Sequence, residues 1–546
     1  MPELLGAMYG HAATRPTAPA LLVVGAKRYR QFAYADLGAE TDRWAARFAS
    51  LRFEPDAIVA IVLEHRYELY PAFLGAMRAG AIPTFLPFPT PKQDPVLYWK
   101  GQRELFARVR PACVVAESAL AGPLGALCPP PCIVLDVDVP WEAPPVALPP
   151  LEAVERPERI ALLQHSSGTT GAKKGVALTY RAIAMHNAAA AHALEARTSD
   201  LTVSWLPLYH DMGLIAAFLL PIWIGSSVVS LDAFEWLLSP ASLLETIEHY
   251  RATHAWLPNF AFEHLVRTHD ADRTYDLRSM RAFVDCSEPC KPGTFARFAA
   301  TFAASGVTPD MLRTCYAMAE TVFAVTLGLP HEPARTLAVD AGALRSRNAL
   351  APAGADAAEF LSCGRPLAGV EIRILAAEGE DVGEIVLRSP YLFSEYHRNP
   401  EATADAFVDG WYGTGDLGFV RDGELFVCGR RKEMLVVHGR NFYSNDIEAA
   451  VNEVEGVKPG RVAVFGRFDD ATGSEEAVVL AESEEEDEAR KLVLVRQIRS
   501  QVYSVLGLQV RTVEIRRVGE LIKTTSGKIS RDENERRFAD AALGVS

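Results

Sequence analysis

The chain has 546 residues, of which 49% are hydrophobic and 23% are charged, a composition ordinary for a soluble globular protein. This length predicts more than one domain and allows several sizeable cores. The formal net charge of −14 argues against general nucleic-acid binding, which usually leaves a basic surface, and favours a role in solubility.

Short apolar runs alternate with helical patterns along most of the chain. The runs expected as buried strands are Ile58–Leu63, Cys113–Ala116, Ile133–Leu135, Ile160–Leu163 and Ser227–Leu231. The segments expected as helices are Ala72–Arg78, Arg181–Ala196 and Ser242–Tyr250. Apolar strands that alternate with helices predict an α/β architecture with largely parallel sheets.

Two composition changes mark the organisation of the chain. A Pro-rich stretch from Pro129 to Pro150 indicates a connector, and a boundary is expected near Cys428-Gly429-Arg430, after which the chain is more charged. We therefore expect a large N-terminal domain of α/β subdomains over residues 1–428. A small α+β domain is expected over residues 429–546.

The strongest single motif follows the strand expected at Ile160–Leu163. It combines glycines, four hydroxyl side chains and two lysines, and its residues are Ser166, Ser167, Gly168, Thr169, Thr170, Gly171, Lys173 and Lys174. Glycines let the backbone approach a ligand closely, and exposed N–H groups with hydroxyls can wrap phosphate oxygens. The spacing is not that of a Walker A loop, which disfavours a P-loop kinase. The alternative is a flexible surface turn, which is disfavoured by so many hydroxyls, glycines and lysines between a strand and an Ala-rich helix.

This loop is similar to the phosphate-binding signature of the acyl-adenylate-forming superfamily, which includes acyl-CoA synthetases and fatty acyl-AMP ligases. Lys173 is a departure, because the family often has proline there. The resemblance implies ATP and Mg²⁺ as cofactors and a carboxylic acid as substrate.

Two further segments resemble the fatty acyl-AMP ligase branch. Trp205–Leu214 is similar to its substrate-pocket motif and implies that His210 lies near the reacting carboxylate; a helix-capping His-Asp pair is the alternative. Pro258–Glu263, together with Trp256, implies aromatic side chains that line an acyl tunnel. Judged alone, such aromatics more often pack in a core.

The adenine and metal motifs come next along the chain. Ser287, Glu288 and Pro289 align with the family's adenine-pocket loop, in which Cys286-Ser287 replaces the common Gly-Ala. The resemblance implies that Tyr316 stacks on adenine, that Glu320 helps to hold Mg²⁺ and takes part in catalysis, and that Thr321 bonds a phosphate. Magnesium is a hard cation that prefers such oxygen ligands. The same motif contains Ala317, where glycine is usual, and Met318.

The last motifs complete the series. Val382–Thr403 resembles a structural motif, and Trp411–Gly418 resembles the ribose motif. In that motif Asp416 would accept from the ribose hydroxyls, and Arg430 would also contact the ribose. Lys432 occupies the position of an interdomain hinge. Gly439–Glu448 resembles a fatty acyl-AMP ligase segment, and Lys528, in the terminal Lys523–Arg531 loop, occupies the family's catalytic lysine position.

The resemblance implies adenylation of a fatty or related acid and transfer of the acyl group to the phosphopantetheine thiol of an acyl carrier protein. An acyl-CoA synthetase that uses free CoA is the alternative. A fatty acyl-AMP ligase carries an insertion that discourages the CoA-competent arrangement, and Val322–Phe360 is long enough to contain a related segment. A non-catalytic acyl or nucleotide sensor is disfavoured, because Lys528, Glu320 and the hydroxyl-rich loop are present.

Cellular context is indicated by what the sequence lacks. The pairs Cys128/Cys132 and Cys286/Cys290 have no neighbouring ligands in a zinc pattern, so reduced thiols are expected. No signal peptide is apparent at the start, and no apolar stretch is long enough to span a bilayer. These features predict a cytoplasmic protein without a membrane span.

Overall fold

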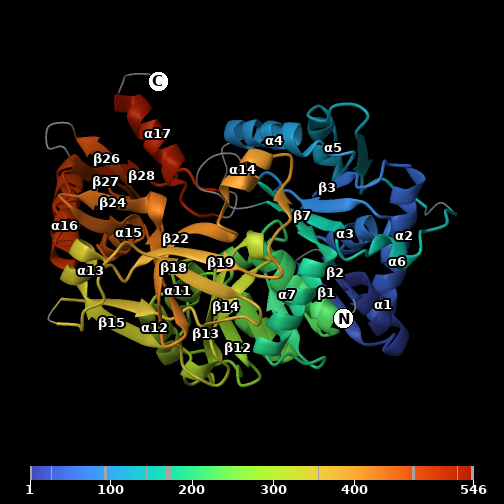
Figure 1. Cartoon of the computed structure of the whole chain (residues 1–546), viewed down its shortest axis with the longest axis horizontal. Helices are drawn as coiled ribbons and strands as arrows, with labels where there is room; N and C mark the ends of the chain where they lie inside the picture. Colours follow the sequence, from blue (N-terminus) through green and yellow to red (C-terminus); the bar gives the residue numbers. More distant parts are fainter. Residues whose placement is uncertain are drawn as a thin grey trace.

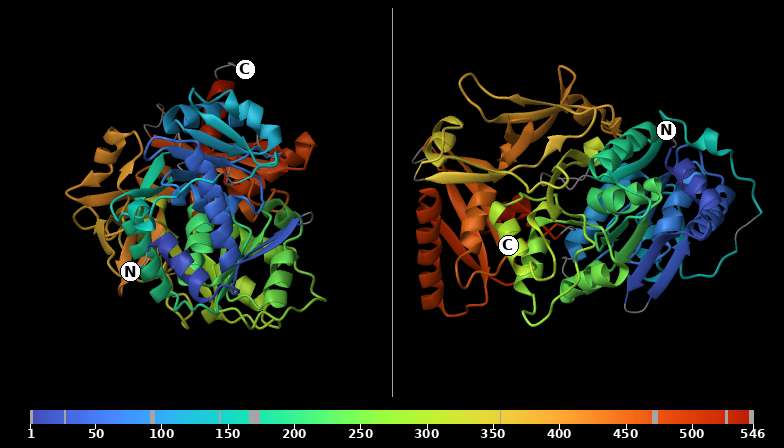
Figure 2. Two further views of the ribbon diagram at one scale, coloured as in Figure 1. Left: turned by 90° about the vertical axis from the view of Figure 1, so that its right-hand side faces the viewer. Right: turned by 90° about the horizontal axis from the view of Figure 1, so that it is seen from below.

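The computed structural model describes residues 3–25, 28–90, 95–142, 145–165, 174–354, 356–469, 474–524 and 527–542. The chain forms a large body followed by a smaller group of C-terminal elements. Figure 1 shows the N-terminal helices and strands at one end of the molecule and the C-terminal β26, β27 and α16 at the other, and Figure 2 shows the same arrangement from two other sides.

The main sheet of the large body has nine strands. In spatial order they are β17 (Arg365–Pro366), β14 (Ala324–Leu327), β13 (Leu312–Ala317), β12 (Ala282–Asp285), β11 (His254–Leu257), β9 (Leu201–Ser204), β10 (Ser227–Leu231), β1 (Pro19–Gly25) and β2 (Arg28–Ala33). The strands from β13 to β1 are all parallel to their neighbours, and only the edges are antiparallel. Strands such as β12 are buried throughout, because a parallel sheet is covered by helices on both faces.

A second sheet of four parallel strands lies nearer the N-terminus. Its order is β4 (Ile82–Phe85), β3 (Ile58–Val62), β5 (Cys113–Ala116) and β6 (Ile133–Asp136). All five predicted strands are confirmed, with ends that differ by at most two residues. The prediction of mostly parallel sheets is likewise confirmed.

Helices cover the two parallel sheets. They are α1 (Leu4–Thr14), α2 (Tyr34–Ser50), α3 (Leu69–Arg78), α4 (Pro95–Val109), α5 (Ser118–Gly125), α6 (Leu151–Val154), α7 (Tyr180–Ala193), α8 (Leu220–Ile224), α9 (Ala233–Leu238), α10 (Ala241–Tyr250), α11 (Asn259–Arg267) and α12 (Pro292–Thr301). Residues Met212–Leu219 form a π-helical segment. The three predicted helices correspond to α3, α7 and α10. The Thr179 side chain caps α7 by accepting from the Ala182 N–H at 3.1 Å.

Antiparallel strands occupy the stretch before the C-terminal elements. One sheet contains β18 (Glu371–Leu375), β19 (Gly383–Arg388), β22 (Trp411–Arg421), β21 (Phe407–Val408) and β23 (Glu424–Arg430). A separate pair, β15 (Thr336–Asp340) and β16 (Ala357–Leu361), encloses α13 (Ala341–Arg347). The helix α14 (Pro400–Asp405) follows β20 (Glu395–Tyr396).

The C-terminal elements have a mixed arrangement and their own core. They are β24 (Met434–Val437), β25 (Arg440–Tyr443), α15 (Ser444–Asn452), β26 (Val462–Asp469), β27 (Ser474–Ser483), α16 (Glu488–Leu506), β28 (Thr512–Arg517) and α17 (Arg531–Ala542). In their sheet, β27 is antiparallel to β26 and parallel to β28. Buried residues of α15, α16 and these strands pack together, for example Ile447, Val479 and Ile498. The predicted combination of a large α/β body with a small α+β unit is confirmed.

Two expectations about the whole chain can be compared with the structure. All eight cysteines lie in the described ranges, and none is in a disulfide. In the same ranges, no helix is long and apolar enough to cross a membrane.

Candidate active site

The candidate residues come from distant segments and meet where the parallel strands β12 and β13 end. Ser287 and Glu288 follow β12, and Ala317, Met318 and Glu320 end or follow β13. In open α/β sheets the carboxyl ends of the strands are the usual place for a ligand.

Asp416 lies at the centre of a polar trio. The Tyr316 hydroxyl donates to its Oδ2 at 2.6 Å, and the Arg430 Nε lies 3.1 Å from its Oδ1. Asp416 and Arg430 face each other across the β22–β23 pair, and Tyr316 is on β13. Burial raises the pKa of the Asp416 carboxyl, and the neighbouring Arg430 opposes that rise. The sequence named all three as nucleotide residues, and the fold brings them into contact.

Local hydrogen bonds explain why the sequence Thr414-Gly415-Asp416 suits this turn. The Thr414 hydroxyl donates to the Ile385 carbonyl at 2.7 Å and accepts from the Asp416 N–H at 3.0 Å, which holds the start of the turn. Gly415 has a φ of 73°, a conformation that favours glycine. The Gly415 N–H also donates to the Glu384 carboxylate at 3.1 Å. These bonds orient the Asp416 side chain toward Tyr316.

Glu320 is buried and follows β13, and it contacts the end of the phosphate loop indirectly, through Tyr396. Its Oε1 accepts from the Tyr396 hydroxyl at 2.7 Å, and the Lys174 Nζ lies 4.3 Å from the centre of the Tyr396 ring. Tyr396 is on β20, which pairs with β8 (Gly175–Thr179) directly after Lys174. Glu320 therefore contacts the hydroxyl of Tyr396 while Lys174 lies against the ring of the same tyrosine.

A tight turn follows Glu320. The Phe323 N–H donates to the Thr321 carbonyl at 2.7 Å, and Val322 between them has a φ of 66°, which is a strained conformation for a β-branched residue. Thr321 is fully buried, and its hydroxyl lies within hydrogen-bond distance of the carbonyls of Met318 and Phe323. A phosphate contact would require this hydroxyl to exchange a backbone acceptor. Met318 is half-buried, and its N–H donates to the Phe323 carbonyl at 2.9 Å.

Lys528 reaches the site from the end of the chain. Its Nζ donates to the backbone carbonyl of Ser287, 241 positions earlier. Ser287 has a φ of 71°, and this unusual conformation turns the backbone of the adenine-type loop at that residue. Within the described residues, no carboxylate lies at ion-pair distance from Lys528, so its positive charge remains available to an anion.

The remainder of the adenine-type loop is bound to the start of α11. Glu288 Oε2 accepts from the Phe260 N–H at 2.9 Å, at the start of α11. Cys286 is fully buried, and Pro289 is exposed. Asp285, directly before the loop, is also fully buried, and burial raises the pKa of its carboxyl well above the ordinary range.

His210 precedes the π-helical segment, on the same side of the sheet. Its ring contacts that of Tyr209 edge-on, with the ring centres 4.8 Å apart. Asp211 caps the segment by accepting from the Met212 N–H at 2.9 Å. Burial raises the pKa of Asp211, while the charge of Lys528 lowers it and that of Glu320 raises it. Asp211 therefore lies within electrostatic range of both Lys528 and Glu320.

The aromatic residues of the Pro258–Glu263 motif have different surroundings. Phe262 is fully buried between Phe295 and Phe298 and belongs to a core. Phe260 is 39% exposed and lies edge-on to Trp205. Of these two phenylalanines, Phe260 is therefore the one that remains a candidate for contact with an acyl chain.

The hydroxyl-rich phosphate loop lies mostly outside the described residues, which resume at Lys174. The undescribed members are Ser166, Ser167, Gly168, Thr169, Thr170, Gly171 and Lys173. The flanking elements correct one expectation. The loop joins β7 (Ile160–His165) to the antiparallel strand β8, with His165 paired to Gly175, and so does not lead directly from a strand into the helix α7.

Sequence reasoning missed two features of this region. Tyr396 lies inside the Val382–Thr403 motif but was not singled out, because its contact with Glu320 depends on the tertiary structure. Lys291, two residues after Pro289, forms an ion pair of 2.9 Å with Asp446 on α15 and so joins the large body to the C-terminal elements. Asp446 lies in the Gly439–Glu448 motif, which was the available signal.

The side chains of the site can be compared with the ligands that a metal ion needs. Among the described residues, no group of three or more His, Cys, Asp or Glu side chains is arranged to hold a metal ion. A single carboxylate such as Glu320 fits Mg²⁺, which is usually bound by one or two carboxylates together with substrate phosphates. The buried Asp416 carboxylate, already fixed by two donors, fits the hydroxyls of a ribose.

Comparison with known proteins identifies the family of the chain. The family model for AMP-binding enzymes matches residues 9–397. The medium-chain-fatty-acid–[acyl-carrier-protein] ligase JamA of Moorena producens is 31% identical over 71% of this chain and 69% of its own length. A putative acyl-CoA synthetase of Caulobacter vibrioides is 28% identical over 98% of this chain and 95% of its own.

A solved structure gives the same result at the level of the fold. It comes from a study of fatty acyl-adenylate ligases from E. coli and L. pneumophila, is 26% identical and has a TM-score of 0.89, covering 100% of this chain and 99% of that one. The motif series, the convergence of its residues and the family match over well over half of the chain lead to one conclusion. The chain belongs to the AMP-binding enzyme family, and its similarity to fatty acyl-adenylate ligases extends over its full length.

Proposed function

We propose that this enzyme uses ATP to convert a fatty or related carboxylic acid to its acyl-adenylate with release of pyrophosphate, and then transfers the acyl group to the phosphopantetheine thiol of an acyl carrier protein. The observation that carries the proposal is the position of Lys528. Its ammonium group contacts the Ser287 carbonyl, next to the adenine-type loop, on the side of the sheet where Asp416, Tyr316 and Glu320 lie.

The nucleotide half of the site is assigned to residues already in contact. The ribose hydroxyls donate to Asp416, Arg430 holds that carboxylate in place, and Tyr316 presents its ring to the adenine. Ser287, Glu288 and Pro289 border the purine. The Ser166–Gly175 loop binds the β- and γ-phosphates, in the role that its hydroxyls and glycines predict.

The metal is assigned to Glu320. This carboxylate accepts one hydrogen bond from Tyr396, which leaves its other oxygen for Mg²⁺. When bound, the ion neutralises phosphate charge. Lys174, which lies against the ring of Tyr396, is the cation assigned to the same phosphates.

Adenylation requires the substrate carboxylate to attack the α-phosphorus, which places negative charge on the α-phosphoryl oxygens. Lys528 is the mobile cation that meets this charge, and it pairs now with a neutral carbonyl that it can exchange for an anion. His210 borders the carboxylate end of the substrate. Preorganised positive charge and positioning are the main contributions a protein makes to phosphoryl chemistry.

The choice of acceptor is supported by contacts of the β15–α13–β16 segment. Asn348, which follows α13, accepts from the Asn441 side chain of β25 at 3.0 Å, and Arg345 lies over the Phe442 ring. Val339 and Leu344 share a hydrophobic cluster with Tyr443. This segment overlaps Val322–Phe360, the stretch long enough to contain the insertion of a fatty acyl-AMP ligase, and its contacts join the large body to β25 of the C-terminal elements. Free CoA, favoured by the similarity to a putative acyl-CoA synthetase, is the competing acceptor.

Product analysis tests the proposal. A panel of acids is first screened by ATP–pyrophosphate exchange, and the best acid is then incubated with ATP, Mg²⁺ and either CoA or a phosphopantetheinylated carrier protein. In the incubation with CoA, mass spectrometry should find that acyl-AMP accumulates. In the incubation with the carrier protein, it should find the acyl group attached to the phosphopantetheine of the carrier.

Lys528→Ala identifies the adenylation step, which it should slow roughly 10²–10³-fold, comparable with loss of one preorganised donor. Lys523→Ala, in the same loop, is the matched control and should retain most of the exchange activity. Efficient acyl-CoA turnover at the rate of adenylation would overturn the carrier-protein assignment and leave the adenylation chemistry intact. Normal exchange activity in Lys528→Ala would remove that lysine from the mechanism.

A further inference from the structure

A pocket of about 790 Å³ lies away from the candidate active site. Its walls come from the C-terminal end of α7, the Leu327–Pro330 segment after β14, and Arg365–Ala368. Arg313, the second residue of β13, lines it, whereas Tyr316 is near the opposite end of the same strand and Glu320 follows that end. The pocket is therefore at the amino-terminal edge of the sheet, and none of its lining residues belongs to the motifs assigned to the nucleotide.

Arg313 is only 3% exposed. Its Nε donates to the Gly328 carbonyl at 2.8 Å, and its Nη2 donates to the same carbonyl and to that of Ala193 at 3.0 Å. These acceptors are neutral, and among the described residues no carboxylate is within ion-pair distance of the guanidinium. Burial lowers the pKa of Arg313 to about 10. Such a buried charge is costly unless it is paired.

The positive charge of Arg313 is partly stabilised by the end of a helix. Ala193 is the last residue of α7, and a cation near a helix C-terminus is stabilised by the helix dipole. Arg281 donates to the Glu195 carbonyl at 3.0 Å in the same region. Arg281, however, also binds the Asp200 carboxylate at 2.9 Å, whereas Arg313 has no such partner. The two arginines near one helix end therefore differ in charge compensation.

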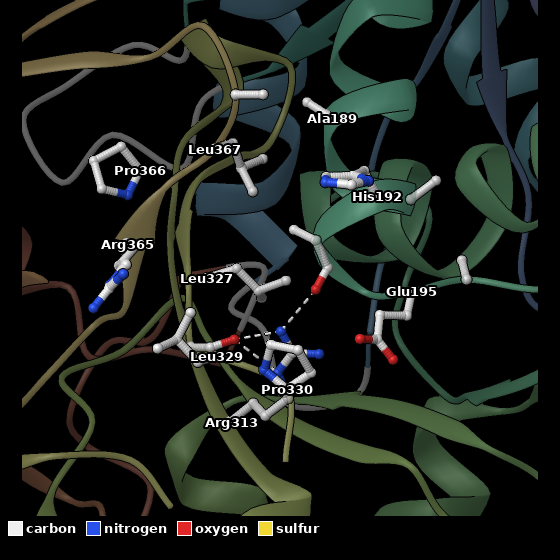
Figure 3. A pocket seen from close by; sticks show the side chains of 15 residues that line it. Ala189, His192, Glu195, Arg313, Leu327, Leu329, Pro330, Arg365, Pro366 and Leu367 are labelled. Atoms are coloured by element: carbon white, nitrogen blue, oxygen red, sulfur yellow. Dashed lines mark hydrogen bonds between the residues drawn. The ribbon is translucent and has the colours of Figure 1, made fainter. Parts of the chain in front are cut away.

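The free edge of the guanidinium faces the pocket. Within the described part of the chain, the hydrogen bonds of Arg313 are made by Nε and Nη2 and none by Nη1, and Figure 3 shows the side chain beside Leu329 and Pro330, with α7 opposite. The Glu195 carboxylate also lines the pocket, and its charge opposes the fall in the pKa of Arg313 without forming an ion pair with it; its ion-pair partners are His331 at 3.2 Å and Arg281 at 3.7 Å. The other lining is largely apolar and includes Leu327, Leu367 and the alanines of α7.

We propose that this pocket binds a small organic monocarboxylate, whose charged group pairs with Arg313 and whose apolar body lies against Leu327, Leu329 and Leu367. One buried cation matches one negative charge. A phosphate dianion would bring a second charge into an apolar wall without a partner, which is unfavourable. Arg365, exposed at the rim, adds attraction for an anion as it enters. The pocket's volume is within the usual range for a small-molecule site.

The test uses 4-fluorophenylacetate as the probe and fluorine NMR as the readout, with the full-length enzyme and its active site filled by a non-hydrolysable acyl-adenylate analogue. Wild-type enzyme should bind the probe at millimolar concentration. Arg313→Gln should weaken binding about tenfold or more, because a charge-assisted hydrogen bond is lost. Arg365→Gln, at the rim, is the matched control and should weaken it less.

Two further arms keep the proposal testable if Arg313→Gln does not fold. Leu329→Trp retains the guanidinium but fills the pocket, so it should abolish binding. In the wild-type enzyme, the neutral amide of the probe should bind more weakly than the acid by about tenfold or more, because an amide cannot form the charge-assisted hydrogen bond with Arg313. Equal binding of acid and amide, unchanged binding to Leu329→Trp, displacement of the probe by inorganic phosphate at lower concentration than by phenylacetate, or no binding to wild-type enzyme would each overturn the proposal.

Discussion

Asp416 shows how burial and hydrogen bonding together prepare one side chain for a ligand. Water is nearly excluded from it, since the residue is 7% exposed, and both of its oxygens already have donors from Tyr316 and Arg430. A carboxylate has about four lone-pair sites, so it can accept ribose hydroxyls without losing these partners. In the proposed role as ribose ligand, the Asp416 side chain would therefore meet the nucleotide with its position already fixed by these two contacts.

Asp416→Ala should raise KM for ATP by roughly tenfold or more, because hydrogen bonds to a charged group contribute about 1.5–3 kcal/mol each. The penalty should shrink with 2′,3′-dideoxy-ATP, which lacks the hydroxyls. Tyr316→Phe is the control, because it removes one donor to Asp416 and retains the acceptor. Exchange kinetics with both nucleotides provide the measurement. An equal penalty with the dideoxy analogue would show that Asp416 acts elsewhere.

At the scale of elements, α1 is tied to the large body by a buried carboxylate. Glu155, directly after α6, accepts from the Leu5 N–H at 2.6 Å and from the Gly6 N–H at 2.8 Å, both in the first turn of α1. These N–H groups have no partner within the helix, so a carboxylate there is favourable. Burial nevertheless raises the pKa of Glu155 from 4.5 to about 7, and the two N–H donors oppose the rise.

Glu155→Gln should loosen α1 by about 1 kcal/mol, since an amide replaces one of the two acceptor oxygens with a donor. The pH dependence has a defined sign. Because the pKa of Glu155 is raised, the folded state binds the proton of this carboxyl more tightly than the unfolded state does. The stabilisation that this proton gives to the folded state is fully present below pH 4.5 and is lost as pH rises through about 7. Hydrogen exchange of the α1 amides, corrected for intrinsic rates, provides the measurement. The protection of these amides should fall more between pH 5 and pH 8 in the wild-type protein than in Glu155→Gln, because only the wild type has a carboxyl that titrates in this range. Parallel pH profiles would contradict this assignment.

On the scale of the whole molecule, a few polar contacts join the large body to the C-terminal elements. Lys291 pairs with Asp446, Asn348 with Asn441, and Lys528 with the Ser287 carbonyl. Arg531, three residues after Lys528, is bound to Glu433 and Glu448, each at 2.6 Å, and so fixes the lysine loop to the other C-terminal elements. The proposed boundary at residues 428–429 falls within β23, just before the Arg431–Glu433 turn that contains Lys432. Displacement of the C-terminal elements would therefore displace Lys528 with them.

Breaking the Lys291–Asp446 pair should slow adenylation by at most about fivefold, because a half-exposed ion pair contributes about 0.2–1 kcal/mol. Lys291→Ala and Asp446→Ala should each show this loss, and the double variant should be no slower than either. Pyrophosphate exchange measures all three. Additive losses in the double variant would mean that the two residues act independently.

Local patterns in the sequence determined much of the fold and named most of the candidate site. Apolar runs predicted strands such as β5 and β10 because burial on both faces of a parallel sheet requires continuous apolar residues. The motif series named Asp416, Tyr316, Glu320 and Lys528 because particular chemistry requires particular side chains. Such information is contained within a few neighbouring residues.

Only the tertiary structure decided which of these residues meet and what else joins them. The contact of Tyr396 with Glu320 spans 76 positions and that of Lys528 with Ser287 spans 241, and contacts so distant leave no periodic trace in the sequence. The same limit explains why Phe262 was grouped with candidate tunnel residues although it packs in a core, and why the strand β8 after the phosphate loop was missed. An apolar or aromatic residue is suited to a core and to a ligand pocket alike, and only the packing of distant elements around it determines which of the two it lines.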